Sequence, residues 1–268
     1  MTDTAAAARH WQRPPFIADA RLRWALILGA LAYLVVGIGS LEVNWSRLSE
    51  GLARGARFVA AFAHPDFTSR WGDIVQGFAE SLTMTVTSTA VGVLLSLPVA
   101  VGAARNLAPP AVYALCRAFI AVSRSVNEII VAILLVAMFG FGPFAGFLTL
   151  TFATIGFMAK LMAEDIEEID ADQIDALRAT GASFWQWLDF AVLSQVMPRL
   201  IGLSMYRLDI NFRESAVIGI VGAGGVGATL NTAMDRYEYD VAAAIILVII
   251  AIVLVAEYSS GLLRKHIQ

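Results

Sequence analysis

Long apolar runs alternate with short polar connections along most of the chain. The hydrocarbon core of a bilayer is about 30 Å thick, and a helix needs about 20 residues to cross it. Six apolar runs have roughly this length: residues 22–41, 81–104, 119–141, 144–163, 200–221 and 241–263. The pattern therefore predicts an all-α polytopic membrane protein with about six transmembrane helices.

The first apolar run follows a polar tail, residues 1–21, that carries arginines. This run is long enough to span a bilayer and lacks a clear small-residue cleavage site, so we interpret it as a retained helix and not as a signal peptide. The next segment, residues 42–73, has apolar side chains at roughly helical spacing. We expect it to form a peripheral helix on the outer membrane surface, within a region 22–72 that precedes the remaining spans in 73–268.

The basic residues favour an orientation with the amino terminus inside the cell. Lys and Arg in short flanks set orientation, whereas acidic residues contribute little. With the amino terminus inside, more Lys and Arg fall in cytoplasmic flanks than in outer flanks, and most of the outer ones lie in the segment 42–73.

Composition supports a membrane protein and excludes several other classes. Of the 268 residues 58% are hydrophobic and 15% charged, with a mean hydropathy of +0.70, which is too apolar for an ordinary soluble domain. The net charge of −3 offers no basic surface for nucleic acid. Cys116 is the single cysteine, and the three histidines are scattered without ligand spacing, so we predict no disulfide and no metal site.

A strongly charged stretch, residues 164–199, separates the fourth and fifth predicted spans. Its pattern predicts two helices around a turn at Gly181, because glycine accepts the left-handed conformation that ends a helix. Phe184, Trp185 and Trp187 follow the turn and have the character of interface anchors. The alternative is a solvated loop whose aromatic side chains rest on the membrane interface.

Ionisable residues also occur inside predicted spans, where they are costly and therefore candidates for function. Two pairs have the four-residue spacing of one helical face, Arg124 with Glu128 and Asp209 with Arg213. They can neutralise each other at helix or subunit interfaces. The functional alternative is that an arginine lines the path of an oxyanion, for which Arg213 is our candidate. The intramembrane charges that cluster are Arg124, Glu128, Arg207, Asp209, Arg213 and Glu214.

The glycine-rich run 222–227 formally matches a dinucleotide-binding fingerprint. No βαβ unit surrounds it, and the final apolar span lies where an acidic ribose-binding residue would be expected. Glycines at a helix end allow close backbone packing and bending. We therefore assign this run to a gate, formed by Gly222, Gly224, Gly225 and Gly227.

The charged stretch resembles the cytoplasmic signature of ABC importer permeases. Asp175 and Ala176 stand for the start of a Glu-Ala-Ala triplet, Gly181 follows at the family spacing, and Leu193 and Pro198 match its Leu-Pro portion. The resemblance implies that residues 164–198 are the segment that couples the permease to its ATPase, with Pro198 breaking the helix before the fifth span. The implied coupling residues are Asp175, Ala176, Gly181, Phe184, Trp185 and Trp187.

Three further runs resemble permeases of the phosphonate type. They are RSVNE at 124–128, FGFGPFAG at 139–146 and NFRESAVIGIVGAGGVG at 211–227. Asn127 occupies a position where many such permeases have proline, so phosphonate, phosphite and hypophosphite all stay open as solutes. Methionine-importer permeases share the glycine-rich end and are a nearby alternative.

The resemblance implies a type I ABC importer permease fold in residues 73–268 and a subunit of a larger assembly in the bacterial inner membrane. The expected partners are a second permease subunit in a homodimer, two cytosolic ATPase subunits and an extracytoplasmic solute-binding protein. ATP and Mg²⁺ would be bound by the ATPase, because this chain has no GxxxxGK[ST] loop and no identifiable catalytic residues.

Two functions from other classes compete with this interpretation. A secondary transporter would work without an ATPase, but inverted repeats between the two halves are not evident. A membrane scaffold without transport would explain exposed aromatic side chains, yet it does not explain the clustered intramembrane charges.

Overall fold

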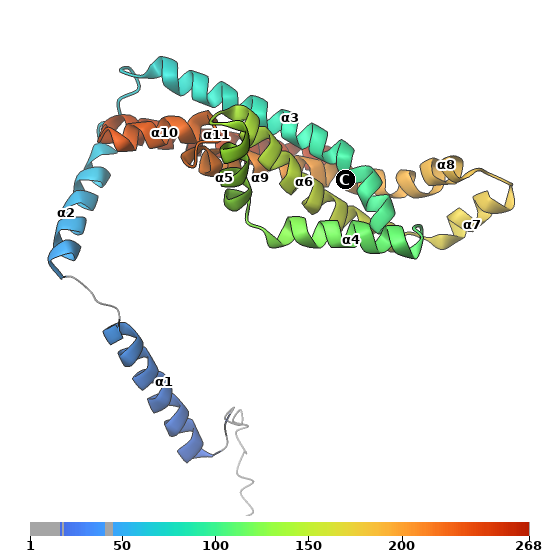
Figure 1. Ribbon diagram of the computed structural model, residues 1–268, viewed down its shortest axis with the longest axis horizontal. Coiled ribbons are helices and arrows are strands. Elements are labelled where there is room, and N and C mark those ends of the chain that lie inside the picture. The colour runs from blue at the N-terminus through green and yellow to red at the C-terminus, as the bar shows by residue number, and fades with distance from the viewer. Residues whose placement is uncertain (1–16, 18, 41–44, 268) are drawn as a thin grey trace, which may run out of the picture. The chain divides into compact units, whose positions relative to one another are not determined.

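The computed structural model describes residue 17, residues 19–40 and residues 45–267, and the regular elements in these ranges are all helices. The chain divides into two units, Met1–Arg57 and Phe58–Gln268, each of which is described by itself. Figure 1 labels the helices.

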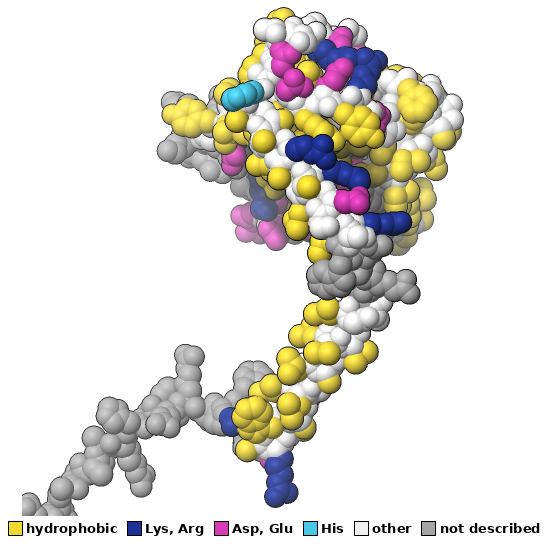
Figure 2. All heavy atoms as spheres, turned by 90° about the vertical axis from the view of Figure 1, so that its left-hand side faces the viewer, with side chains coloured by type: hydrophobic (Ala, Val, Ile, Leu, Met, Phe, Trp, Pro, Cys, Tyr) yellow, Lys and Arg dark blue, Asp and Glu magenta, His cyan; other side chains and the backbone are white. Residues whose placement is uncertain are grey.

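The first unit contains the helix predicted from the first apolar run. α1, Ala20–Ser40, is apolar after Arg21 and Arg23 in its first turn and has no buried side chain, and Figure 2 shows hydrophobic side chains along it. α2, Trp45–Ala61, confirms the helix predicted in the following segment. Its position on the outer membrane surface stays a prediction.

The second unit is a helical bundle. At its centre α3 (Trp71–Ala103), α6 (Pro143–Glu167) and α9 (Ser194–Ile220) pack against one another, and α3 packs most extensively on α6. α4 (Pro110–Ser125), α5 (Glu128–Phe139), α10 (Gly225–Asp235) and α11 (Tyr239–Ile267) surround them. The short helices α7 (Ala171–Ala179) and α8 (Phe184–Trp187) lie at the end of the bundle away from α10 (Figure 1).

Four segments among the described residues are long and apolar enough to cross a membrane, or five if the bent pair α4–α5 counts as one span. They are Ala20–Ser40, Trp71–Ala103, Pro143–Glu167 and Phe184–Asp235, which contains α9. The last predicted span falls in α11, whose apolar part Tyr239–Val255 is shorter than a full span by the same measure. Of the six predicted spans, four are long apolar helices, one is the bent pair α4–α5, and the last is a shorter apolar helix.

α3 differs from the predicted span 81–104 because it begins ten residues earlier, at Trp71. At 1.5 Å per residue its 33 residues extend about 50 Å, more than a bilayer core requires. The additional turns carry Asp73, Gln76 and Glu80, whose polarity hid them from a search for apolar runs.

A buried polar triad joins the three central helices. The side-chain amide of Asn211 on α9 donates to the hydroxyls of Thr89 on α3, at 2.8 Å, and Thr154 on α6, at 2.9 Å. Gly92 lets α3 approach α6 here, because a Cβ at this position would lie 2.6 Å from Thr154. Hydrogen bonds between small polar side chains hold helices together in lipid, where apolar burial gives no preference.

Candidate functional site

The cytoplasmic signature folds as two helices around a turn, as predicted. α7, Ala171–Ala179, is capped by Asp170, whose carboxylate accepts from the Asp172 N–H at 3.0 Å. α8, Phe184–Trp187, is preceded by the N-cap residue Ser183, whose N–H donates to Gln186 Oε1 at 2.8 Å. Both are helix caps that the local sequence encodes.

Gly181 ends α7 in the predicted left-handed conformation, with φ of +80°. The N–H of Gly181 donates to the carbonyl of Arg178 at 3.0 Å, and the N–H of Ala182 donates to that of Leu177 at 3.4 Å. This pair of bonds is a Schellman motif, and it satisfies carbonyls that the end of a helix leaves unpaired. The turn is therefore a defined structure and not a loose loop.

The three aromatic residues after the turn do not share one role, which corrects the expectation that all three are interface anchors. Trp185 is 75% exposed and Phe184 is partly exposed, whereas Trp187 is only 6% exposed. The Arg178 guanidinium carbon lies 4.4 Å from the Trp187 ring centroid, and the Phe184 ring lies at 4.9 Å. Trp187 therefore holds α8 against α7 and is not available as an anchor for a partner.

Asp175 and Ala176 lie on the exposed side of α7, where a partner can reach them. The Asp175 carboxylate is within 3.9 Å of Arg178 and is largely solvent-exposed. Exposed pairs of this kind contribute little to stability, so Asp175 is available for contacts outside the chain.

Phe184 and Trp185 also line an apolar groove of about 510 Å³ beside the end of α3 and the α3–α4 connection. Its other walls include Leu97, Val101 and Leu188. The exposed aromatic side chains of α8 are thus part of a continuous hydrophobic surface.

The connection from α8 into α9 corrects the expected break at Pro198. A π-helical turn, η1, covers Leu188–Leu193, and α9 then begins at Ser194 and runs through Pro198. Proline cannot donate to the carbonyl four residues earlier, which here belongs to the first residue of α9. The irregularity therefore lies before Pro198, and an ion pair of 3.0 Å between Arg199 and Asp165 ties the start of α9 to α6.

Inside the bundle, the predicted span 119–141 is broken between α4 and α5, which bend by 93°. Val126 is extended, and the Asn127 side chain caps α5 by accepting from the Ile129 N–H at 2.9 Å. Arg124 ends up on α4 and Glu128 on α5, so their predicted position on one helical face is wrong. The reason is that the helix stops between them.

The break opens onto a cavity of about 310 Å³. Arg124 and Glu128 line it, together with Arg207 of α9 and Phe157 of α6. The guanidinium carbons of Arg124 and Arg207 lie 5.6 Å and 5.2 Å from the Phe157 ring centroid. The remaining lining residues are Ser123, Ser125, Val126, Asn127 and Ala153.

Arg207 is only 2% exposed and is held from two sides. Its guanidinium lies 3.3 Å from the Glu214 carboxylate and donates to Thr154 Oγ1 at 3.2 Å. Glu214 thus has a structural partner, Arg207, that the four-residue spacing did not identify, because the two residues lie about two turns apart on the same face of α9.

Asp209 and Arg213 form the predicted ion pair along α9, at 2.9 Å. The Arg213 side chain is 54% exposed, and Asp209 is mostly buried. Neither residue lines the cavity at the α4–α5 break.

Three of the four predicted gate glycines form a tight turn where α9 gives way to α10, and Gly227 lies in the first turn of α10. Gly222, Gly224 and Gly225 all have positive φ, between +73° and +95°. The carbonyl of Gly222 accepts from the N–H of Gly142 at 3.0 Å, which joins this turn to the α5–α6 turn. A side chain at Gly227 would collide with the backbone of Ala216.

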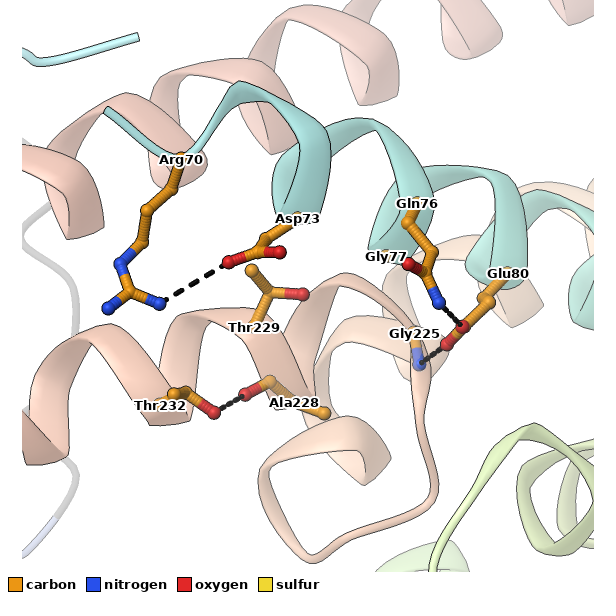
Figure 3. Close-up of a pocket in the computed structure, with 9 residues that line it drawn as sticks. All are labelled: Arg70, Asp73, Gln76, Gly77, Glu80, Gly225, Ala228, Thr229 and Thr232. Carbon is orange, nitrogen blue, oxygen red and sulfur yellow. Dashed lines mark hydrogen bonds and ion pairs between the residues drawn. The ribbon is translucent and has the colours of Figure 1, made fainter. Parts of the chain in front are cut away.

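Side chains of α3 cap the amino end of α10, a contact that the sequence did not suggest (Figure 3). Glu80 Oε2 accepts from the Gly225 N–H at 3.1 Å, and Ser81 Oγ accepts from the Val226 N–H at 3.0 Å. Figure 3 also shows Gln76 directed at Glu80, which it meets at 3.0 Å. A polar cavity of about 240 Å³ lies here between α3 and α10.

At the start of α3, ion pairs join Arg70 to the helix itself and to the segment before α11. Arg70 pairs with Glu238 at 2.7 Å and with Asp73 at 3.3 Å. Figure 2 shows basic and acidic side chains interspersed on the face that it presents at this end. Among the described residues, no group of three or more His, Cys, Asp or Glu could hold a metal ion.

A bundle of apolar helices long enough to cross a membrane, with a polar cavity at the α4–α5 bend and a capped helix–turn–helix at one end, is typical of membrane transport subunits. The chain belongs to the family of binding-protein-dependent transport system inner membrane components, which residues 92–268 match.

Two permeases of named transport systems are similar to this chain. It is 44% identical over 204 residues to the phosphate-import permease protein PhnE of Mycolicibacterium smegmatis, covering 76% of this chain and 38% of that protein. It is 38% identical over 245 residues to the phosphite transport system permease protein PtxC of Stutzerimonas stutzeri, covering 91% of this chain and 88% of that protein. The chain thus spans less than half of the first relative and most of the second.

Solved structures agree on the fold. A chain of the inward-facing MetNI methionine ABC transporter matches with a TM-score of 0.62 at 24% identity, over 73% of this chain and 96% of that one. The protein therefore has the type I ABC importer permease fold, as the resemblance implied.

Proposed function

We propose that this chain is the membrane-spanning permease subunit of an ATP-driven importer for a small phosphorus oxyanion such as phosphonate, phosphite or hypophosphite. The observation that carries the proposal is the 38% identity to a phosphite transport permease along nearly the whole of both chains. The likeness to the methionine transporter is 24% identical and supports the fold, not the solute.

The helix–turn–helix of α7 and α8 is the part of the chain that docks on a cytosolic ATPase. Its Schellman turn fixes the angle between the helices, and it leaves Asp175, Phe184 and Trp185 accessible. Movement of the ATPase would reach the bundle through η1 and through the ion pair between Arg199 and Asp165. ATP and Mg²⁺ act in that partner, so the chain itself is not an enzyme.

A second permease subunit and an extracytoplasmic solute-binding protein complete the proposed assembly. Large apolar side chains on α4 and α5, among them Leu115, Ile130 and Met138, are exposed on the isolated chain. Lipid or a second permease would cover them. We place the amino terminus in the cytoplasm and the glycine turn at the outer end, where it would act as the gate.

Reconstitution tests the function directly. The permease would be purified with its ATPase, inserted into liposomes with the binding protein, and supplied with phosphite, hypophosphite, methylphosphonate or methionine. We expect ATP turnover and uptake to rise with a phosphorus oxyanion. Stimulation by methionine alone would move the chain to the methionine importers, and uptake without any ATPase would make it a secondary transporter.

A further inference from the structure

The cavity at the α4–α5 break lies where the chain leaves helical geometry. Non-helical backbone at membrane depth is tolerated where it lines a polar cavity or is buried in protein. Here the chain leaves helical geometry for Val126 and Asn127, and Ser125, Asn127 and Glu128 open onto the cavity. Broken helices of this kind place binding sites near the membrane midplane in other transporters.

Two guanidinium groups from different helices face this cavity. Arg124 comes from the end of α4 and Arg207 from α9, and Phe157 lies within cation–π distance of both. Arginine presents planar N–H donors that match the oxygens of a phosphorus oxyanion two at a time. Two guanidinium groups beside one polar cavity can therefore donate hydrogen bonds to an anion that has two or three oxygens.

The charges around the cavity leave Arg124 available for a ligand. Arg207 is already paired with Glu214, and the Glu128 carboxylate lies in the first turn of α5, where the helix amino end stabilises negative charge. Within the described residues, Arg124 has no ion-pair partner within 4.0 Å, and its guanidinium lies over the Phe157 ring. Among these residues Arg124 therefore has no direct counter-ion, and the nearest acidic side chain of the cavity lining is that of Glu128.

We propose that this cavity is an oxyanion subsite on the path of the solute, with Arg124 as the direct ligand and Arg207 as the buried second donor. The proposal rests on the proposed function and places the solute contact at a different position from Arg213. The Arg213 guanidinium is paired with Asp209 and lies outside the cavity. Ser125 and Asn127 offer further polar atoms at the break.

The test measures anion binding and transport separately. Phosphite binding to the purified permease–ATPase complex, without binding protein, would be followed by ³¹P NMR line broadening. Arg124→Gln removes the charge, and Arg124→Lys keeps the charge but loses the planar fork. Arg105→Gln is the matched control, because Arg105 is an exposed arginine outside the cavity.

We expect saturable phosphite binding that weakens at least tenfold in Arg124→Gln, less in Arg124→Lys, and not in Arg105→Gln. Copurification of the ATPase verifies that each variant is folded. Equal binding by wild type and Arg124→Gln overturns the subsite, as does normal phosphite transport in Arg124→Gln together with its loss in Arg213→Gln.

The same measurements separate this inference from the proposed function. A wild-type complex that transports phosphite but shows no Arg124-dependent binding retains the function and loses the subsite. A complex that binds phosphite through Arg124 but does not transport phosphorus oxyanions retains the subsite and loses the function. Absence of both binding and transport refutes both.

Discussion

Trp185 and Trp187 are two residues apart and have opposite environments. Each helical residue turns by about 100°, so residues two apart point to nearly opposite sides of a helix. Trp185 accordingly faces outward, and Trp187 packs under Arg178 and against Phe184. A docking role therefore belongs to Trp185, and Trp187 belongs to the fold.

Alanine substitutions separate these roles. Trp187→Ala should lower the unfolding free energy by about 3–5 kcal/mol, the usual cost of removing a large buried ring. Trp185→Ala should leave stability unchanged and weaken ATPase binding by about 2 kcal/mol, which is roughly thirtyfold. Thermal unfolding in detergent and ATPase titration measure the two effects. Unchanged ATPase binding in Trp185→Ala would remove this residue from the proposed interface.

At the scale of elements, the turn between α7 and α8 depends on one backbone conformation. Nothing lies within 4 Å of where a Cβ on Gly181 would be, so a substitution there meets no neighbour. The cost comes from the positive φ alone, which β-branched residues strongly disfavour.

Gly181→Val should therefore misplace α8 relative to α7 while the membrane helices stay intact. The backbone strain is about 1–3 kcal/mol, enough to weaken ATPase docking tenfold or more and to stop coupled transport. Gly181→Asn is the matched control, because asparagine tolerates the left-handed region and should retain most coupling. Copurification of the ATPase and solute-stimulated ATP turnover report the outcome. Wild-type values for the valine variant would show that the turn does not couple hydrolysis to transport.

At the scale of the whole molecule, orientation is the property that labelling can settle. Ala63 precedes α3, and Asp172 lies in α7 at the other end of the bundle, and both positions are exposed. In a background with Cys116→Ala, a cysteine at Ala63 should react with a membrane-impermeant maleimide on intact cells. A cysteine at Asp172 should react only after permeabilisation. Detergent-solubilised protein, in which both sites should react, is the control, and labelling of both on intact cells contradicts the orientation.

The sequence by itself determined the class of this protein and the local geometry of its coupling segment. Apolar runs predict helices because lipid requires every backbone polar group to be paired within the chain, and Gly181 predicts a left-handed turn because backbone sterics act over a few residues. The motif that begins at Asp175 was sufficient to identify the coupling segment. These features depend on neighbours in sequence, and the structure retains them.

Contacts between helices were decided only by the tertiary structure. Spacing placed Arg124 and Glu128 on one face, but the cap at Asn127 ends one helix and starts another between them. Arg207 reaches the same cavity as Arg124, and Glu80 caps a helix that begins 145 residues later. Hydrophobic periodicity predicts which side of a helix is buried, but it does not predict which other helix covers that side. Whether residues at a favourable spacing meet is therefore decided by packing, and not by the sequence around them.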